Sequence, residues 1–237
     1  MTHIVAGYPT LRESEDIALM MLESGVQFLE IQIPFSDPVA DGPVIMKANQ
    51  IALDNGTTPD MCFELMQRLK KKSDIPLLFM TYYNILFRYG LEEFCRRAKE
   101  VGCYGFIVPD IPIDEEPYDH YLETCKRYGL HAIQVISPIT PDERLKKIGK
   151  VASGFVYCIS MLGTTGSLDG LPPELSDYIG RVRKYVTTKL ALGFGISSKM
   201  DVENALKDAD IAVMGSVFIR TYEKGGKNSL QQLLESL

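Results

Sequence analysis

Two carboxylates and an amide lie close together near the start of the chain. In the run FLEIQIPFSDPVADGP, Glu30 and Gln32 fall on one side of an apolar segment, and Asp41 follows in the next loop. Successive side chains of a strand point to opposite faces, so the Leu, Ile and Ile of this segment share the other face. If helices cover that aliphatic face, Glu30 points into the interior of a sheet or barrel.

A carboxyl group in such an interior can act as a general acid and base. Burial disfavours the charged form of a carboxyl group, which suits a group that gives and takes protons near neutral pH. A structural interpretation of Glu30 stands beside this one, in which it pairs with a buried Lys or Arg or lies at a solvated strand end. The strand alone does not decide between the two.

The loop that follows Glu30 favours a functional site. Three prolines restrict its backbone, and Gly42 permits a tight turn beside Asp41. A stiffened acidic loop at the end of a strand is a typical position for binding and catalytic residues. Loops are often acidic because they are solvated, so Asp37 or Asp41 alone is a weak indication.

Eight repeated units along the chain could position these residues. Helix starts are indicated by Thr10 with Glu13, by Thr58 before Pro59 and by Thr140 before Pro141. Several helices are expected to end at a glycine shortly before the next strand, as at Gly25, Gly102 and Gly129. The predicted strands cover residues 3–6, 28–33, 77–81, 105–108, 132–136, 155–159, 190–194 and 211–214.

This alternation of strands and helices predicts the fold. Apolar strands separated by helices are typical of a parallel sheet covered on its outside, and eight units in 237 residues fit one (β/α)8 TIM barrel over residues 1–237 better than two domains. An open doubly wound sheet is the alternative. Its dinucleotide-binding version carries GxGxxG at the first strand-to-helix turn, where this chain has AGYP.

Glycine-rich segments follow the last three predicted strands. Barrels of this class often bind phosphate with the loops after the seventh and eighth strands. Gly195 follows the seventh strand, and Gly215 and Ser216 follow the eighth, where a helix can begin. Their backbone N–H groups are expected to surround a phosphate, and a Gly-Thr-Thr-Gly segment at 163–166 is placed to close over it.

The composition narrows the class of protein. The chain is 46% hydrophobic and 24% charged with a net charge of -6, which disfavours nucleic acid or an anionic membrane as the main partner. No apolar run approaches the roughly 20 residues of a membrane span, and the start of the chain lacks a signal-peptide pattern, so a cytoplasmic location is expected. The five cysteines and three histidines are scattered, which predicts reduced, buried thiols and no metal site.

Taken together, four motifs resemble those of the tryptophan synthase alpha chain family. They are PFSDPVADGP after the second strand, Ser-x-x-Gly-x-Thr-Gly after the sixth, GFGIS after the seventh and Gly-Ser after the eighth. The resemblance extends from Gly7 to the last helix. The motif after the second strand is highly specific, whereas the glycine loops alone would also suit other phosphate-binding barrels.

The resemblance implies a lyase that cleaves indole-3-glycerol phosphate to indole and glyceraldehyde 3-phosphate by a retro-aldol reaction. Glu30 matches the family's acid/base residue, and Asp41 matches the carboxylate that accepts a hydrogen bond from the indole N–H. Tyr157 matches a tyrosine beside the acid, and Thr165 matches a residue that orders Asp41 when the site closes.

The resemblance also implies a partner and three further groups of residues. The partner is a pyridoxal phosphate-dependent beta chain, in an alpha2-beta2 complex, and this chain itself needs no cofactor. The expected phosphate site is Gly166, Gly195, Gly215 and Ser216. The expected apolar wall for indole is Tyr82, Ile107, Phe194 and Val213, although each of these equally suits the barrel core. The expected partner contacts are Asp37, Pro38, Asn84 and Pro112.

Two departures from the family pattern leave alternatives open. The chain begins almost at the first strand, where the family usually has an N-terminal helix that closes the bottom of the barrel. Gln32 stands where a glycine is frequent, on the same face as Glu30. These departures prompt one alternative function, a weakly catalytic regulatory partner of the beta chain. A stand-alone lyase that releases free indole is a second alternative.

Overall fold

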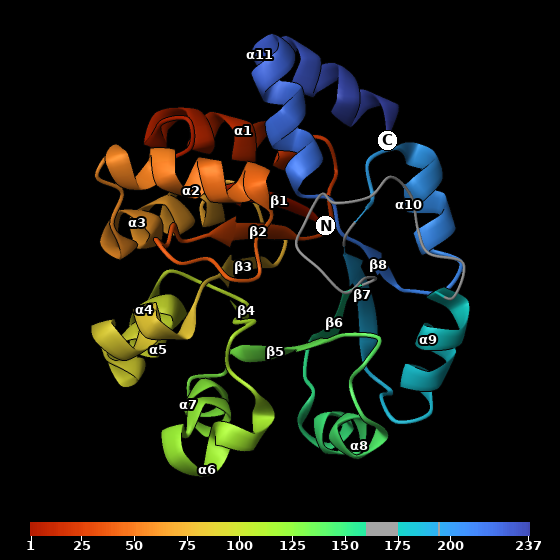
Figure 1. Ribbon diagram of the computed structural model, residues 1–237. Helices are drawn as coiled ribbons and strands as arrows, with labels where there is room; N and C mark the ends of the chain where they lie inside the picture. Colours follow the sequence, from red (N-terminus) through yellow and green to blue (C-terminus); the bar gives the residue numbers. More distant parts are fainter. Residues whose placement is uncertain (160–174, 194) are drawn as a thin grey trace.

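The computed structural model describes residues 1–159, 175–193 and 195–237. In these residues eight parallel strands form one sheet, and each strand pairs with the next one in the chain. An isolated parallel bridge between Thr2 and Met214 joins the first strand to the end of the eighth, and the N–H of Met214 donates to the carbonyl of Met1 at 3.0 Å. The sheet closes into the predicted TIM barrel, with its helices outside (Figure 1).

The observed strands lie within one or two residues of the predicted ones. They are β1 (Thr2–Val5), β2 (Leu29–Gln32), β3 (Leu77–Met80), β4 (Gly105–Ile107), β5 (His131–Ile136), β6 (Phe155–Ile159), β7 (Lys189–Gly193) and β8 (Ile211–Ala212). The ends differ because the backbone ladder can include a polar residue before the apolar run, as at Thr2, His131 and Lys189, and can stop before that run ends, as after Ala212.

The helices of the described residues alternate with these strands. They are α1 (Leu11–Glu23), α2 (Pro43–Asp54), α3 (Pro59–Lys70), α4 (Tyr83–Tyr89), α5 (Leu91–Glu100), the 3₁₀ turn η1 (Ile113–Glu115), α6 (Glu116–Asp119), α7 (Tyr121–Arg127), α8 (Asp142–Val151), α9 (Leu175–Arg183), α10 (Lys199–Ala205) and α11 (Ser216–Ser236). Helix α11 packs against α1 and α2 and so covers the seam between the first and last strands.

Two of the three predicted helix caps are confirmed. Thr10 Oγ1 accepts a hydrogen bond from the N–H of Glu13 at 3.2 Å at the start of α1, and Thr58 Oγ1 accepts one from the N–H of Met61 at 3.4 Å at the start of α3. These bonds satisfy N–H groups that have no acceptor within their helix.

The predicted cap at Thr140 is wrong. Pro141 occupies the cap position of α8, and Thr140 Oγ1 accepts a hydrogen bond from the N–H of Ser137 at 2.9 Å. A threonine hydroxyl can serve a local turn as well as a helix start, and here the turn is the closer partner. The glycine helix ends are confirmed, because Gly25, Gly102 and Gly129 all have positive φ.

Side-chain alternation divides the sheet into two faces, as predicted. Leu29 and Ile31 are fully buried under the outer helices, in the largest apolar cluster of the described residues. Phe28 packs on the opposite face, in the barrel interior, where its ring meets Phe155 edge-on with a centroid distance of 5.6 Å. Glu30 and Gln32 therefore point inward with Phe28.

An aromatic cluster joins the outer helices to the third and fourth strands. Phe94 on α5 is fully buried, and its ring lies 5.0 Å from that of Phe63, 5.3 Å from Phe106 and 5.6 Å from Tyr89, measured between centroids. Edge-on contacts of this kind stabilise a core beyond the area that they bury. The cluster lies outside the barrel wall, away from Glu30.

Replacing Phe94 by alanine should lower the free energy of unfolding by about 3–5 kcal/mol, because it leaves a cavity in this cluster. The measurement is urea unfolding followed by circular dichroism. Phe87→Ala is the matched control, because this side chain is 68% exposed, and it should change stability by less than about 0.5 kcal/mol. Equal losses in the two variants would contradict this assignment of the core.

Candidate active site

Glu30 lies in the middle of β2 and points into the barrel, where it is 4% exposed. The strand register sets His3 of β1 directly beside it. His3 Nδ1 is 3.3 Å from Glu30 Oε1, and the histidine is 5% exposed. Among the described residues, Glu30 therefore forms a buried pair with an imidazole, and not with a Lys or Arg.

Asp41 is held at the mouth of the barrel by two amide side chains. Gln32 Nε2 donates to Asp41 Oδ2 at 2.6 Å, and Asn49 Nδ2 donates to the same oxygen at 3.4 Å. Burial raises the pKa of Asp41, and the bond from Gln32 together with the nearby His3 opposes that rise. These donors favour the carboxylate in a place that by itself favours the neutral acid.

Asn49 fixes the loop that carries Asp41. It projects from α2, is 1% exposed, and accepts a hydrogen bond from the N–H of Phe35 at 3.1 Å. Within the loop, the N–H of Asp41 donates to the carbonyl of Pro38 at 2.9 Å. The stiff loop predicted from its prolines is therefore also secured from a helix.

Tyr157 enters the cavity from β6, opposite the two acids. The position of its ring depends on Gly193 in the neighbouring strand, because a Cβ there would lie 2.4 Å from the tyrosine hydroxyl oxygen. Burial, followed by the charges of Glu30 and Asp41, raises the pKa of Tyr157 well above its usual value. The phenol therefore stays neutral and can donate or accept a hydrogen bond.

The start of α11 faces the same cavity. Gly215 is the cap residue of this helix and Ser216 is its first residue. The first N–H groups of a helix lack intrahelical acceptors and carry a partial positive charge, so they favour an anion. Gly195, after β7, has a φ of 78°, a conformation that glycine adopts at little cost.

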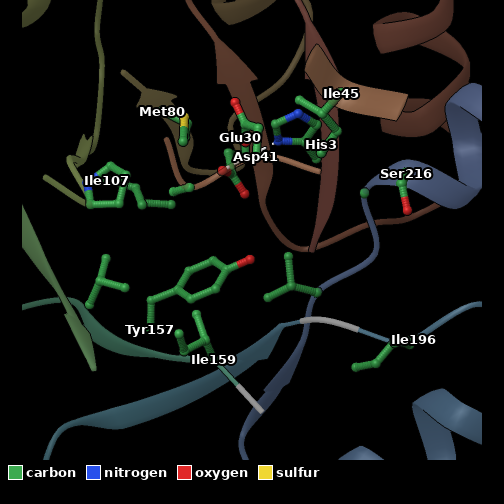
Figure 2. A pocket seen from close by; sticks show the side chains of 16 residues that line it. His3, Glu30, Asp41, Ile45, Met80, Ile107, Tyr157, Ile159, Ile196 and Ser216 are labelled. Carbon is green, nitrogen blue, oxygen red and sulfur yellow. Dashed lines mark ion pairs between the residues drawn. The ribbon is translucent and has the colours of Figure 1, made fainter. Parts of the chain in front are cut away.

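One cavity of about 210 Å³ connects these elements. Figure 2 shows Glu30, His3 and Asp41 grouped on one wall, the Tyr157 hydroxyl directed inward from another, and Ser216 at the start of α11. Among the described lining residues there is no Lys or Arg. Within the described ranges, no group of three or more His, Cys, Asp or Glu side chains is placed to hold a metal ion.

Eight of the predicted site residues line this cavity. They are Glu30, Asp41, Tyr157, Ile107, Val213, Gly195, Gly215 and Ser216. Tyr82 is not among the lining residues; it is fully buried beneath the Asp41 loop, where its hydroxyl oxygen accepts a hydrogen bond from the N–H of Ala40 at 3.2 Å. Thr165, Gly166 and Phe194 lie outside the described residues.

The four expected partner contacts follow three neighbouring strands at one rim of the barrel. Asp37, Asn84 and Pro112 are exposed, and Pro38 is buried. Large apolar side chains are exposed in the same loops and in the helix after β3, namely Val39 and Phe87. The rim combines polar and apolar exposed groups around the mouth of the cavity.

Two residues of this site were not found from the sequence. In the sequence, His3 is one of three scattered histidines, and Asn49 is one polar residue in an ordinary amphipathic helix. The alternation of β1 puts His3 and Val5 on one face, which is a weak indication that His3 points inward. No local pattern indicates that Asn49 reaches the loop that precedes its helix.

Among the described helices, none has the length and apolar character that crossing a membrane requires. All five cysteines are free and buried, as expected. These findings agree with the composition of the sequence.

Comparisons with known proteins agree with the motifs. The family model of the tryptophan synthase alpha chain matches residues 1–237. The alpha chain of Syntrophotalea carbinolica is 44% identical over all of this chain and 93% of its own length, and that of Methanocaldococcus jannaschii is 45% identical over 93% of this chain and 78% of its own.

Solved structures show the same likeness. A mutant tryptophan synthase alpha-subunit of Pyrococcus furiosus is 31% identical and superposes with a TM-score of 0.90, covering 100% of this chain and 96% of its own. A Mycobacterium tuberculosis tryptophan synthase structure is 27% identical, with a TM-score of 0.91 over 100% of this chain and 89% of that one. The chain belongs to the tryptophan synthase alpha chain family, whose lyase reaction cleaves indole-3-glycerol phosphate to indole and glyceraldehyde 3-phosphate, with a beta chain as partner.

Proposed function

We propose that Glu30 is the acid/base of the cleavage and that Asp41 binds the indole ring. One observation carries this assignment: the two carboxyl groups enter one cavity that is closed on another side by the start of a long helix. A substrate with an indole ring at one end and a phosphate at the other requires both kinds of group in one cavity.

The proposed cleavage moves one proton in and one proton out. The carboxylic acid of Glu30 protonates C3 of the indole, and the ring then carries a positive charge at its nitrogen. The hydroxyl on the adjacent side-chain carbon loses its proton to Glu30, the bond from C3 to that carbon breaks, and its electrons restore the indole. The side chain leaves as the aldehyde, and Glu30 is again protonated.

Asp41 would stabilise the charge that develops on the ring nitrogen. Gln32 and Asn49 donate hydrogen bonds to it, and these bonds favour its carboxylate form. Tyr157 is neutral and opposite both acids, so it is suited to hold the reacting hydroxyl group or Glu30 by a hydrogen bond. The assignment extends to Thr165 as the residue that orders Asp41 in the closed site.

The phosphate would bind at the start of α11. Backbone N–H groups of Gly195, Gly215 and Ser216 are suited to it, and Gly166 would complete the site. Because the described lining lacks Lys and Arg, backbone dipoles and hydroxyl groups would have to supply the attraction. Ile107 and Val213 line the apolar part and, with Phe194, would contact the indole.

Glu30→Gln should reduce indole release by about 10²- to 10⁴-fold, because the amide cannot exchange the proton. Indole is measured from indole-3-glycerol phosphate with and without an added beta chain, and thermal unfolding verifies the fold. Glu64→Gln, an exposed change on α3, should retain full activity. A fully active Glu30→Gln protein would refute the proposed role.

Ser216→Asp should raise KM by at least about tenfold, because a carboxylate there repels the phosphate at short range. Steady-state kinetics of indole formation provides the measurement. Ser236→Asp introduces the same charge at the exposed far end of α11 and should leave KM unchanged. If both variants bind substrate like the wild type, the phosphate lies elsewhere.

We further propose an alpha2-beta2 complex with a pyridoxal phosphate-dependent beta chain, in the cytoplasm. The beta chain would cover the rim that carries Asp37, Pro38, Asn84 and Pro112. The exposed Val39 and Phe87 support this surface, because apolar groups that face solvent at the mouth of a cavity are typical of an interface.

Asn84→Glu should weaken binding of the beta chain by at least about tenfold, because an unpaired charge at an interface is costly. Titration of the partner-stimulated rate measures the change. Lys150→Glu, exposed near the end of α8 on the opposite side of the barrel, is the control and should leave the titration unaltered. A stand-alone lyase would show high turnover without partner, and a regulatory chain would show little turnover in any mixture.

A further inference from the structure

We propose that His3 is a positioning residue for Glu30, which orients its carboxyl group and shares the proton that the cleavage uses. The inference rests on the proposed role of Glu30. It starts from the buried contact of 3.3 Å between His3 Nδ1 and Glu30 Oε1. Figure 2 shows the two side chains together on one wall of the cavity, joined by their ion pair.

The two acids of the cavity are held in different ways. Asp41 accepts hydrogen bonds from Gln32 and Asn49, which are amides and cannot titrate. His3 is the hydrogen-bonding side chain found next to Glu30 among the described residues, and it can titrate. An amide donor cannot exchange a proton with the acid that it holds, whereas an imidazole can.

The contact with His3 sets the orientation of the Glu30 carboxyl group. Because His3 occupies Glu30 Oε1, the other carboxylate oxygen is left for the cavity. The backbone fixes the geometry, since His3 and Glu30 are paired positions of the β1–β2 ladder. A catalytic group that is held in one orientation before the substrate binds does not have to be ordered during the reaction.

A second side chain, that of Gln32, favours the protonated imidazole. His3 Nε2 and Gln32 Oε1 are both buried without a hydrogen-bond partner among the described residues. They are complementary, because a protonated imidazole carries a donor at Nε2 and the amide oxygen is an acceptor. Gln32, whose nitrogen holds Asp41, is also among the groups that raise the pKa of His3.

The His3–Glu30 pair keeps its proton at a higher pH than an ordinary histidine does, because the pKa of His3 is raised. Burial lowers the pKa of His3, but the charge and hydrogen bond of Glu30, together with the charge of Asp41 and the hydrogen bond of Gln32, outweigh burial, and the net pKa is raised. A raised pKa means that the pair keeps its proton as the pH increases past the point where a free histidine loses it. The pair can then supply Glu30 with the proton that goes to indole C3.

The proton balance is closed. His3 passes a proton to Glu30, Glu30 passes a proton to C3, and the hydroxyl group returns one proton to Glu30 as the carbon–carbon bond breaks. The pair ends with the number of protons with which it began. No oxidant or cofactor is needed for this exchange.

Several other titratable groups surround His3, so the test must follow the imidazole itself. On the cavity side they are Glu30 of β2, Asp41 of the next loop and Tyr157 of β6. The amino group of Met1 lies at the start of β1, and burial lowers its pKa to about 6. Behind β1, Tyr8 and Tyr222 border a small hollow together with His3. An activity profile alone would combine these groups.

The first experiment is an NMR titration of the imidazole resonances of wild type and Glu30→Gln. The chain has three histidines, and His120 and His131 serve as internal references. We expect the His3 midpoint to lie above the usual 6.5 in the wild type and to fall by at least about one pH unit in Glu30→Gln, because the charge of Glu30, the largest influence that raises the pKa, is then gone. An unchanged midpoint overturns the proposal, whatever the activity of Glu30→Gln.

The second experiment uses kinetics of three variants. His3→Phe keeps a ring but no nitrogen and should lower kcat by about 10- to 100-fold, with KM within about threefold. His3→Asn can restore the hydrogen bond to Glu30 without the titration, so it should recover part of kcat, while the basic limb of the pH profile moves to lower pH. His131→Phe removes an imidazole that does not line the cavity and should change neither quantity.

The outcomes separate this proposal from the proposed function. If Glu30→Gln is inactive while the His3 variants keep wild-type kcat and pH profile, His3 is only a packing residue. If Glu30→Gln is active, the role of Glu30 itself fails. Adding His3→Phe to Glu30→Gln should cause little further loss, because the two residues act through one group.

Discussion

Closure of the barrel is the constraint on which the rest of the structure depends. The bridge between Thr2 and Met214 brings the first strand against the last. Gly215 and the start of α11 follow directly, so the helix that faces the proposed phosphate lies next to β1. His3 belongs to β1, which lies between β2 and the end of β8, and it therefore borders both Glu30 and Gly215. One backbone contact thus sets the distance between the acid end and the anion end of the cavity.

Inside that frame, the two carboxyl groups differ because their neighbours differ. Both are almost fully buried. Amide donors from β2 and α2 hydrogen-bond Asp41, while the imidazole of β1 lies against Glu30. Gln32 connects the two arrangements, since its nitrogen binds Asp41 and its oxygen is free for His3. Such a division suits a site where one acid stabilises charge and the other moves protons.

The apolar layer between the helices and the sheet stabilises the fold, so the barrel interior can contain polar side chains. The apolar clusters under the helices and around the aromatic side chains of α3, α5 and the neighbouring strands supply most of the burial. The interior can then contain His3, Glu30 and Gln32, as well as Gly193, which provides no side chain but leaves room for Tyr157. A polar interior is costly only where its groups lack partners, and here most of them bond to each other.

Local sequence patterns are enough to predict the eightfold alternation, the two faces of each strand and the residue types of the cavity. These features follow from local periodicity, so Glu30, Asp41 and Gly215 could be assigned to one end of a barrel without coordinates. The same patterns did not predict the partners of these residues. His3 meets Glu30, and Asn49 meets Asp41, only through strand register and the position of α2 on the sheet. Thr140 is the converse case, since a helix cap and a turn compete for one hydroxyl group and only the folded backbone decides between them. Periodicity is a property of neighbouring residues, whereas a buried pair is a property of distant segments that packing brings together.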